Sequence, residues 1–443
     1  MKNKILLSVL FGLLLVGGWY SQFSKNYQVN REYNSYVNRG DEKYERTLYQ
    51  EAIENYQAAF NLKESQKVMD KLLQTYEKFY DETGSNATRS AWIQKLDEAC
   101  SVYPNVSQYW EDEIELCIEA EDYDKALTVC KKAYSEGIST EKYIELKNQV
   151  KYSYSEKTEY YSEYRNAVNG YFIAAIGSAW RWITGDGEDY SDDYVNLGYI
   201  GEDTYFLCET EGGEICFYDL DGVKRGIVTK DISDFGMYSE GYCSVKYGDD
   251  FAFVDLEGEV LKDKLEECGS FQNGKAPIKL EDGTWEMLAR DGICEMLDVE
   301  QIVYDYAGRY DFDGVVIVKA GGKYQFWDAN LEKQINEFSC NNIDIPTADK
   351  IVAYEDENGK WGYVDYNGKV VIEPQYEQAK SFSNGLAAVM IDGKWGYIDK
   401  NNNMVVECQY LDGGYLSEQG ACFVSDKEGY YKMIVFRFPD LIQ

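Results

Sequence analysis

The sequence contains no histidine in its 443 residues. Imidazole is the commonest general base, the partner of nucleophilic serine and cysteine, and a frequent metal ligand. Its absence excludes Ser-His-Asp and Cys-His catalytic sites and every His-ligated metal site, while carboxylate, lysine or tyrosine chemistry stays open. No catalytic, cofactor-binding or metal-ligating residue stands out, so we predict no cofactor and no enzymatic activity.

Basic residues and proline are also scarce. The chain has 44 Lys and Arg against 79 Asp and Glu, a net charge of −35, and only five prolines. A hydrophobic content of 44% with little proline predicts a folded chain rather than a disordered one. An acidic field with no basic stripe repels the phosphate backbone, which excludes nucleic acid as a partner.

Cysteine is absent before Cys100, and the eleven cysteines of the chain form no metal-binding pairs and no compact disulfide framework. Because most sit in apolar stretches, we predict free, buried thiols. Acidic turns at residues 184–193 and 219–222 are similar to calcium loops. The alternative is that their aspartates only shape turns.

An apolar run from Ile5 to Tyr20 follows Lys2 and Lys4. This pattern predicts a signal-anchor or transmembrane helix over residues 1–24, with the N-terminus in the cytoplasm and the bulk of the chain outside. The predicted protein is thus a single-pass cell-membrane protein with the membrane as one partner. Secretion after cleavage of a signal peptide is the alternative.

Residues 25–165 are polar and nearly free of glycine and proline, which predicts a helical region. Two segments have small and aromatic residues at the offsets of paired helices, namely Gly40, Ala52, Tyr56 and Ala59, and then Trp110, Cys117, Tyr123, Ala126 and Ala133. Small residues at a crossing let two helices approach closely. This pattern resembles tetratricopeptide repeats, which implies a peptide-binding groove, although a plain helical spacer would show similar features.

Residues 166–443 repeat themselves. The stretch from Gly359 and the stretch from Gly393 share a Lys-Trp-Gly-Tyr-Val/Ile-Asp strand, a turn and a second apolar strand that ends in Gln-Tyr. They resemble the WG (Trp-Gly) β-repeat family. Weaker copies recur every 34 to 39 residues, with strand-opening positions at Trp180, Ile215, Phe251, Trp285, Tyr324, Trp361 and Trp395, and an incomplete eighth copy runs from Gly420 to Phe438.

The repeat-defining residues are predicted to be structural. We expect the opening aromatics, Trp180, Phe251, Trp285, Tyr324, Trp361 and Trp395, to pack between adjacent sheets. Gly362 and Gly396 should allow close backbone approach, and Asp365 and Asp399 should form turns. The alternative for the tryptophans is a ring that stacks against sugars.

The predicted architecture is therefore multidomain, α plus all-β: an anchor (1–24), tetratricopeptide-like helices (25–165) and a WG β-repeat domain (166–443). About three strands per unit suit a seven- or eight-unit β-propeller, with a solenoid as the alternative. The predicted function is a non-catalytic, membrane-anchored cell-surface scaffold that binds a protein or peptide. A cell-wall or glycan-binding module and a carboxylate-based hydrolase are the alternatives.

Overall fold

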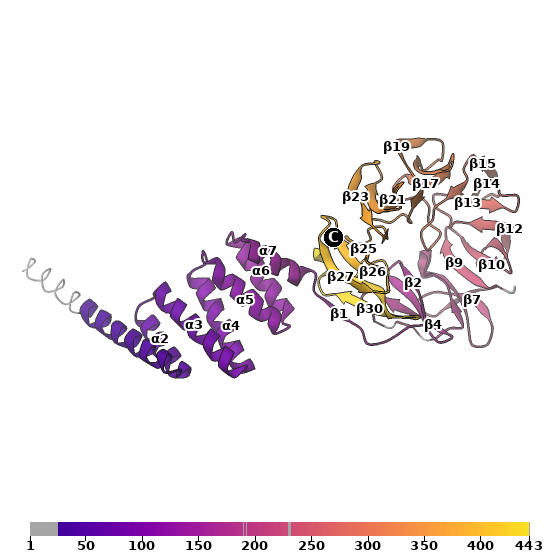
Figure 1. Cartoon of the computed structure of the whole chain (residues 1–443). Helices are drawn as coiled ribbons and strands as arrows, with labels where there is room; N and C mark the ends of the chain where they lie inside the picture. The colour runs from indigo at the N-terminus through magenta and orange to yellow at the C-terminus, as the bar shows by residue number, and fades with distance from the viewer. Residues whose placement is uncertain (1–24, 189, 192, 229–231, 443) are drawn as a thin grey trace, which may run out of the picture. The chain divides into compact units, whose positions relative to one another are not determined.

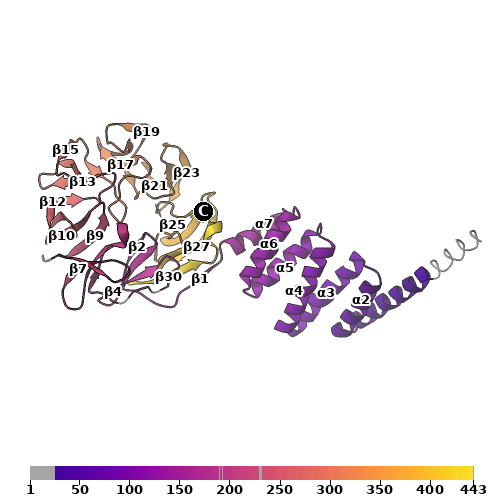
Figure 2. The same ribbon diagram turned by 180° about the vertical axis from the view of Figure 1, so that it is seen from behind.

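The computed structural model describes residues 25–188, 190–191, 193–228 and 232–442, and the chain divides into two compact units. The first, helical unit ends at Lys151, and the second, β unit begins at Tyr152. Both are visible in Figure 1, and in Figure 2 from behind.

The helical unit is a stack in which each helix packs against the next. Residues 25–45 are helical, and the further helices are α2 (Tyr49–Leu62), α3 (Gln66–Thr83), α4 (Asn86–Val102), α5 (Ser107–Glu119), α6 (Tyr123–Ser135) and α7 (Glu141–Lys151). Local signals set some of these limits. Gly84 ends α3 in a left-handed conformation, and the side chain of Asp122 accepts the backbone N–H of Lys125 to begin α6.

Small residues lie where these helices meet. Ala52, Ala59, Ala126 and Ala133 are all 0% exposed. A Cβ atom added to Gly40 would lie 2.5 Å from the ring of Tyr56, so only glycine fits that crossing without a shift. The core of the unit is therefore built on close helix approach, as the alanine spacing indicates.

One acidic side chain is enclosed in this core. Glu113 on α5 is 0% exposed, and Lys125 Nζ on α6 lies 3.5 Å from its Oε1 atom. Burial raises the pKa of Glu113 to about 7; the charge of Lys125 opposes the rise and the charge of Asp97 adds to it. The fold therefore favours the neutral carboxyl.

Replacing Glu113 with Gln should stabilise the helical unit above pH 7 and leave it unchanged below about pH 4. An unfolded glutamate titrates near 4.3, so the wild type loses about 1.4 kcal/mol per pH unit between about 4.3 and 7. Glutamine stays neutral and avoids that loss, an expected gain of about 4 kcal/mol at pH 8. Urea unfolding at both pH values, monitored by hydrogen exchange in α4–α6, measures this change in the free energy of unfolding. Equal gains at the two pH values would contradict the assignment.

The β unit consists of eight four-stranded or three-stranded blades in the described residues, and strands join their neighbours in antiparallel order. Blades one to four contain β2 (Glu163–Val168), β3 (Tyr171–Ile176) and β4 (Ala179–Thr184); β5 (Asn196–Leu197), β6 (Phe206–Glu209), β7 (Ile215–Tyr218) and β8 (Lys224–Val228); β9 (Asp234–Ser239), β10 (Tyr242–Tyr247), β11 (Asp250–Val254) and β12 (Val260–Cys268); and β13 (Lys275–Leu280), β14 (Trp285–Ala289) and β15 (Cys294–Leu297). The long β12 pairs with both β11 and β13 and so joins blades three and four into one sheet.

The second half of the ring repeats this plan more regularly. Blades five to eight contain β16 (Gln301–Ile302), β17 (Val315–Ala320), β18 (Lys323–Asp328) and β19 (Gln334–Cys340); β20 (Asn342–Ile343), β21 (Ile351–Glu355), β22 (Trp361–Asp365) and β23 (Val370–Tyr376); β24 (Gln378–Ala379), β25 (Leu386–Ile391), β26 (Lys394–Asp399) and β27 (Met404–Tyr410); and β28 (Asp412–Gly413), β29 (Ala421–Lys427), β30 (Tyr430–Phe436) and β1 (Tyr154–Glu156). The Trp-Gly strand is the third strand of its blade. One sequence repeat therefore supplies the last two strands of one blade and the first two of the next.

The ring is closed by β1. This strand comes from the N-terminal end of the unit, yet it pairs antiparallel with β30 of the last blade. Blades one and eight also share a core, in which Phe172 and Ile183 meet Phe423 and Met433. Because the first and last units of a solenoid would not touch, the alternative of a solenoid is excluded and the fold is a closed β-propeller.

Two predictions need correction. The helical region is predicted to run to residue 165, but α7 ends at Lys151, and of the tyrosines that follow it Tyr154 lies in β1 and Tyr164 in β2. Tyr154 and Tyr164 serve the β core instead, where their rings pack against Phe436 and Phe423. Tertiary packing therefore overrides the helical pattern.

The second correction concerns the membrane. Among the described residues no helix is both long and apolar enough to cross a bilayer, which contradicts the predicted single-pass membrane protein. The anchor was placed on residues 1–24, which lie outside the described residues. The cell-surface location and the membrane partner inferred from it therefore have no support in the structure.

Candidate functional site

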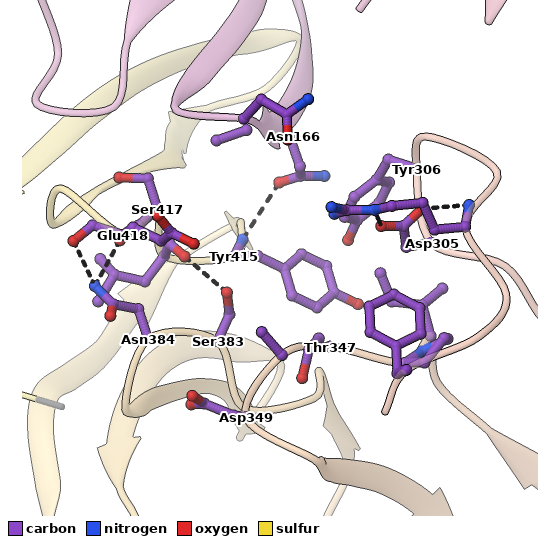
Figure 3. Close-up of a pocket in the computed structure, with 18 of the residues that line it drawn as sticks. Asn166, Asp305, Tyr306, Thr347, Asp349, Ser383, Asn384, Tyr415, Ser417 and Glu418 are labelled. Atoms are coloured by element: carbon purple, nitrogen blue, oxygen red, sulfur yellow. Dashed lines mark hydrogen bonds and ion pairs between the residues drawn. The ribbon is translucent and has the colours of Figure 1, made fainter. Parts of the chain in front are cut away.

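A polar pocket lies at the centre of the propeller (Figure 3). Its volume is about 860 Å³, and most of its walls are the loops that precede the second strand of blades one, five, six, seven and eight. The ring of Tyr306 from blade five meets the ring of Tyr415 from blade eight at 5.2 Å. A contact between blades this far apart in sequence places both rings near the axis of the ring.

Tight turns bring these loops to the axis. In blades one and seven the turn residues are Asn169-Gly170 and Asn384-Gly385, and all four have positive φ between 51° and 85°. Such a pair forms the two-residue hairpin turn that matches the twist of its strands, which asparagine and glycine adopt most easily. Asn384 Nδ2 also donates to the carbonyl of Ser417, 2.7 Å away in blade eight. The turns therefore position the pocket wall and tie neighbouring blades together.

The aromatic centre is held by a half-buried carboxyl, that of Asp344. Tyr415 Oη donates to Asp344 Oδ2 at 2.6 Å, and the backbone N–H of Ser381 donates to the same oxygen at 2.6 Å. Burial raises the pKa of Asp344, and these two hydrogen bonds oppose the rise. The phenol of Tyr415 is thus fixed and presents its ring, not a free hydroxyl, to the pocket.

Most of the other carboxylates of the pocket also have partners, and Glu418 is the exception among the described residues. Asp305 Oδ1 accepts the backbone N–H of Ala307 and of Arg309, at 2.9 and 2.8 Å, and Oδ2 accepts Arg309 Nε at 2.6 Å. Asp349 Oδ2 accepts the N–H of Gly385 at 2.7 Å, and Asp313 pairs with Lys350. These acids fix loops. Within the described residues the pocket therefore has an aromatic, hydrogen-bonding surface rather than two free acids on opposite walls.

The repeat-defining aromatics lie elsewhere, in the contacts between blades. Trp285 is 1% exposed and Trp395 6%, whereas Trp180, Phe251, Tyr324 and Trp361 are half-buried. Each packs on a core shared by two neighbouring blades. None of these six described residues lines the central pocket.

The repeated glycines and aspartates shape the backbone. A Cβ atom on Gly362 would lie 2.6 Å from the carbonyl oxygen of Ile372, and one on Gly396 would collide with that of Val406. Asp365 Oδ1 accepts the N–H groups of Asn367 and Lys369 at 3.0 and 2.9 Å. Asp399 Oδ1 makes the equivalent pair of bonds to Asn401 and Asn403, both at 2.9 Å. Their carboxylates are therefore committed to turns.

A second repeated core position was not predicted from the sequence. Two residues after each strand opening, a large side chain inserts into the core between blades, and every one of them is at most 5% exposed: Trp182, Phe217, Phe253, Met287, Phe326, Tyr363, Tyr397 and Met433. Each of the eight cores between blades contains one member of this set. The signal was present in the sequence, because residues two apart on a strand share a face.

The helical unit has a pocket of its own, of about 620 Å³, between α3 and α5. Leu73, Tyr109 and Leu116 form its buried part, and Tyr80 and Trp92 flank it half-buried. Six acidic residues line it, namely Asp70, Glu77, Asp81, Asp112, Glu115 and Glu119, against one base, Lys142. This acidic groove, as we call it, is an aromatic trough with negative edges.

Comparison with known proteins identifies the repeats. The family model described as WG containing repeat matches residues 251–285, 361–395 and 395–431. These matches begin at three of the predicted strand openings, Phe251, Trp361 and Trp395, so WG repeats are confirmed in residues 251–431. No family match confirms the tetratricopeptide-like helices, and no curated protein matches the chain.

Solved structures with similar folds are distant. BamB from Moraxella catarrhalis has 13% identity and a TM-score of 0.42, and the match covers 62% of this chain and 94% of that chain. The computationally designed Ika8 protein has 12% identity and a TM-score of 0.42, over 64% and 98%. The Dos1 propeller has 11% identity and a TM-score of 0.39, over 61% and 90%. The ring of blades described above rests on the strand pairing of this chain itself.

Proposed function

We propose that the protein is a non-catalytic interaction scaffold that binds segments of other proteins through its two repeat-built units. The carboxylates of the central pocket carry this proposal, because all of them except Glu418 are engaged in turns and ion pairs, which leaves an aromatic, polar surface with no pair of free acids. A hydrolase working through two carboxylates needs one free acid and one free base. A binding surface needs neither.

The shape of the pockets supports the same function. A closed ring of blades and a stack of helices both present rigid surfaces built from loops and helix faces, which can be varied without disturbing the core. Tyr306 and Tyr415 supply aromatic area at low entropic cost at the centre of the ring. Pockets of this size accommodate a few side chains of a bound segment.

Peptide display against the intact chain tests the proposal. Peptides that bind the central pocket should bind about tenfold more weakly when Lys350 and Glu418, at its mouth, are replaced by Ala. A matched variant with Lys427 and Glu257, which do not line the pocket, replaced by Ala should bind as the wild type does. Failure of any peptide to bind in a manner that depends on the central pocket or the acidic groove would overturn the scaffold proposal.

A second candidate is glycan binding, which one observation favours. A pocket of about 730 Å³ between blades one and two is lined by the accessible rings of Tyr190, Tyr194 and Tyr218, which lie over the buried Trp182 and Phe206. Aromatic rings gathered in a hollow are suited to stacking against sugar faces. Retention of the chain on a glycan surface, lost on Tyr218→Ala but kept in the Lys350/Glu418 variant, would promote this candidate over the first.

A further inference from the structure

The acidic groove of the helical unit combines shape, charge and aromatic area in one place. Its residues on α3 are Asp70, Leu73, Gln74, Glu77, Tyr80 and Asp81, and those on α5 are Gln108, Tyr109, Asp112, Glu115, Leu116 and Glu119. Spacings of three and four place each set on one face of its helix. Two helix faces therefore oppose each other across the groove, each with three acids.

Most of this negative charge is uncompensated. Lys142 Nζ lies 2.7 Å from Glu115 Oε2, and Lys78 Nζ lies 3.0 Å from Asp81 Oδ2. In the described part of the chain no ion pair involves the other four acids, which are Asp70, Glu77, Asp112 and Glu119. Burial raises the pKa of Asp112 to about 6, and the charges of Glu115 and Glu77 add to the rise. The carboxylates of the groove therefore repel one another in a site that is partly shielded from water.

The aromatic part of the groove favours a particular kind of cation. The rings of Tyr80 and Trp92 lie 6.0 Å apart, and Tyr109 is 4% exposed with its hydroxyl bound to Asp70. Lysine and arginine bury an aliphatic stem against such surface while the charged end reaches a carboxylate. The indole N–H of Trp92 is buried and has no hydrogen-bond partner among the described residues, so Trp92 offers the groove its ring rather than a polar atom.

The dimensions favour an extended segment. From Asp70 to Asp81 the helix advances about 16 Å, at about 1.5 Å per residue. An extended chain advances about 3.3 Å per residue, so about five residues span the acids of α3. Successive side chains of an extended chain point to opposite sides. Basic residues at neighbouring positions would therefore reach the acids of α3 and of α5 in alternation.

We propose that the acidic groove between α3 and α5 binds an extended, lysine- and arginine-rich segment of a partner protein. This inference rests on the proposed scaffold function and names the chemistry of the partner. Binding replaces repulsion among the acids with ion pairs over an aromatic floor. Because the site is partly buried, these pairs are screened less than ion pairs on an open surface.

Fluorescence anisotropy with the full-length protein tests the proposal. The probe is a labelled six-residue peptide of lysine and arginine, and the comparison peptide has glutamine at every position. Replacing Glu77 and Glu119 with Gln, one acid from each wall, should weaken binding of the basic probe about tenfold. The matched control replaces the exposed acids Glu54 on α2 and Glu145 on α7 with Gln, which removes the same charge outside the groove. This control should change affinity less than about twofold.

Three results would overturn the proposal. The first is that the basic probe binds no more tightly than the glutamine peptide. The second is that both double variants weaken binding equally, which would mean that the probe responds to the overall negative charge of the chain and not to the groove. The third is that spermine binds with the full dependence on Glu77 and Glu119 while the peptide does not. A selection from a random peptide library separates this failure from failure of the scaffold function. Enriched peptides that are not basic but depend on Trp92 would refute the basic partner and retain the scaffold, whereas no enrichment at the groove or the central pocket would refute both.

Discussion

A fragment of residues 166–443, which begins at the boundary predicted from sequence, should fail to form a stable ring, whereas a fragment of residues 152–443 should fold. The shorter fragment lacks β1 and half of β2. It therefore loses all three residue pairs between β1 and β30, which join Tyr154, Ser155 and Glu156 to the last blade. It also loses Tyr161 and Tyr164 from the core shared by blades one and eight.

The side chains of the missing segment are as important as its backbone. Glu156 accepts the Tyr410 hydroxyl at 2.7 Å and Lys432 Nζ at 2.7 Å, and Lys432 is only 9% exposed. The hydrogen bond from Lys432 and then that from Tyr410 hold the pKa of Glu156 below its usual value. Without the segment that contains Glu156, Tyr410 and Lys432 each lose a hydrogen-bond partner, and the edge of β30 is open to pairing with other chains.

Size-exclusion chromatography and thermal unfolding of the two fragments provide the measurement. The longer fragment should be monomeric and unfold in one cooperative transition, and the shorter one should aggregate or show weak protection from hydrogen exchange in β29 and β30. Glu156→Ala in the intact chain is a milder version, with an expected cost of about 1–3 kcal/mol. Equal stability of the two fragments would show that β1 does not close the ring.

The sequence was informative where one residue type serves the same role in every repeat. The spacing of Trp361 and Trp395 located the Trp-Gly strands, and Asp365 and Asp399 marked the turns that follow them. It was less informative where a role appears once. Tyr154-Ser155-Glu156 has no repeat partner nearby, because its strand neighbour β30 lies almost three hundred residues further along the chain, and local pattern alone favoured a helix.

The candidate site was the least predictable part. Asp344, Ser381 and Tyr415 come from three different blades, and their meeting depends on closure of the whole ring. No spacing in the sequence distinguishes these residues from other polar loop residues. The acidic groove was partly predictable from the sequence. The helical spacing of Asp70, Glu77 and Asp81 indicates one acidic helix face, but no spacing indicates that α3 and α5 lie on opposite sides of a groove.

Emptying the repeated core position should have the largest effect of any single substitution. Tyr363 is 0% exposed, and its ring lies 4.7 Å from that of Phe382 in the neighbouring blade. Tyr363→Ala should cost about 3–5 kcal/mol, the usual range for removing a large buried aromatic side chain. Trp361→Ala should cost less, because Trp361 is half-buried. Urea unfolding of the intact chain, followed by hydrogen exchange in β21–β26, compares the two.

Phenylalanine at the same position in adjacent blades then separates packing from hydrogen bonding. The Tyr363 hydroxyl is buried with no hydrogen-bond partner among the described residues, whereas the Tyr397 hydroxyl donates to the carbonyl of Gly414 at 2.9 Å. Tyr363→Phe removes an unsatisfied polar group and should be neutral or stabilising. Tyr397→Phe leaves the Gly414 carbonyl without its donor and should cost about 1 kcal/mol. Both variants keep the ring that fills the core, so neither should approach the loss expected for Tyr363→Ala.

Equal losses for the two phenylalanine variants would mean that a buried water or another group satisfies the Tyr363 hydroxyl. A loss below about 1 kcal/mol for Tyr363→Ala, typical of a surface substitution, would remove this position from the core between blades six and seven.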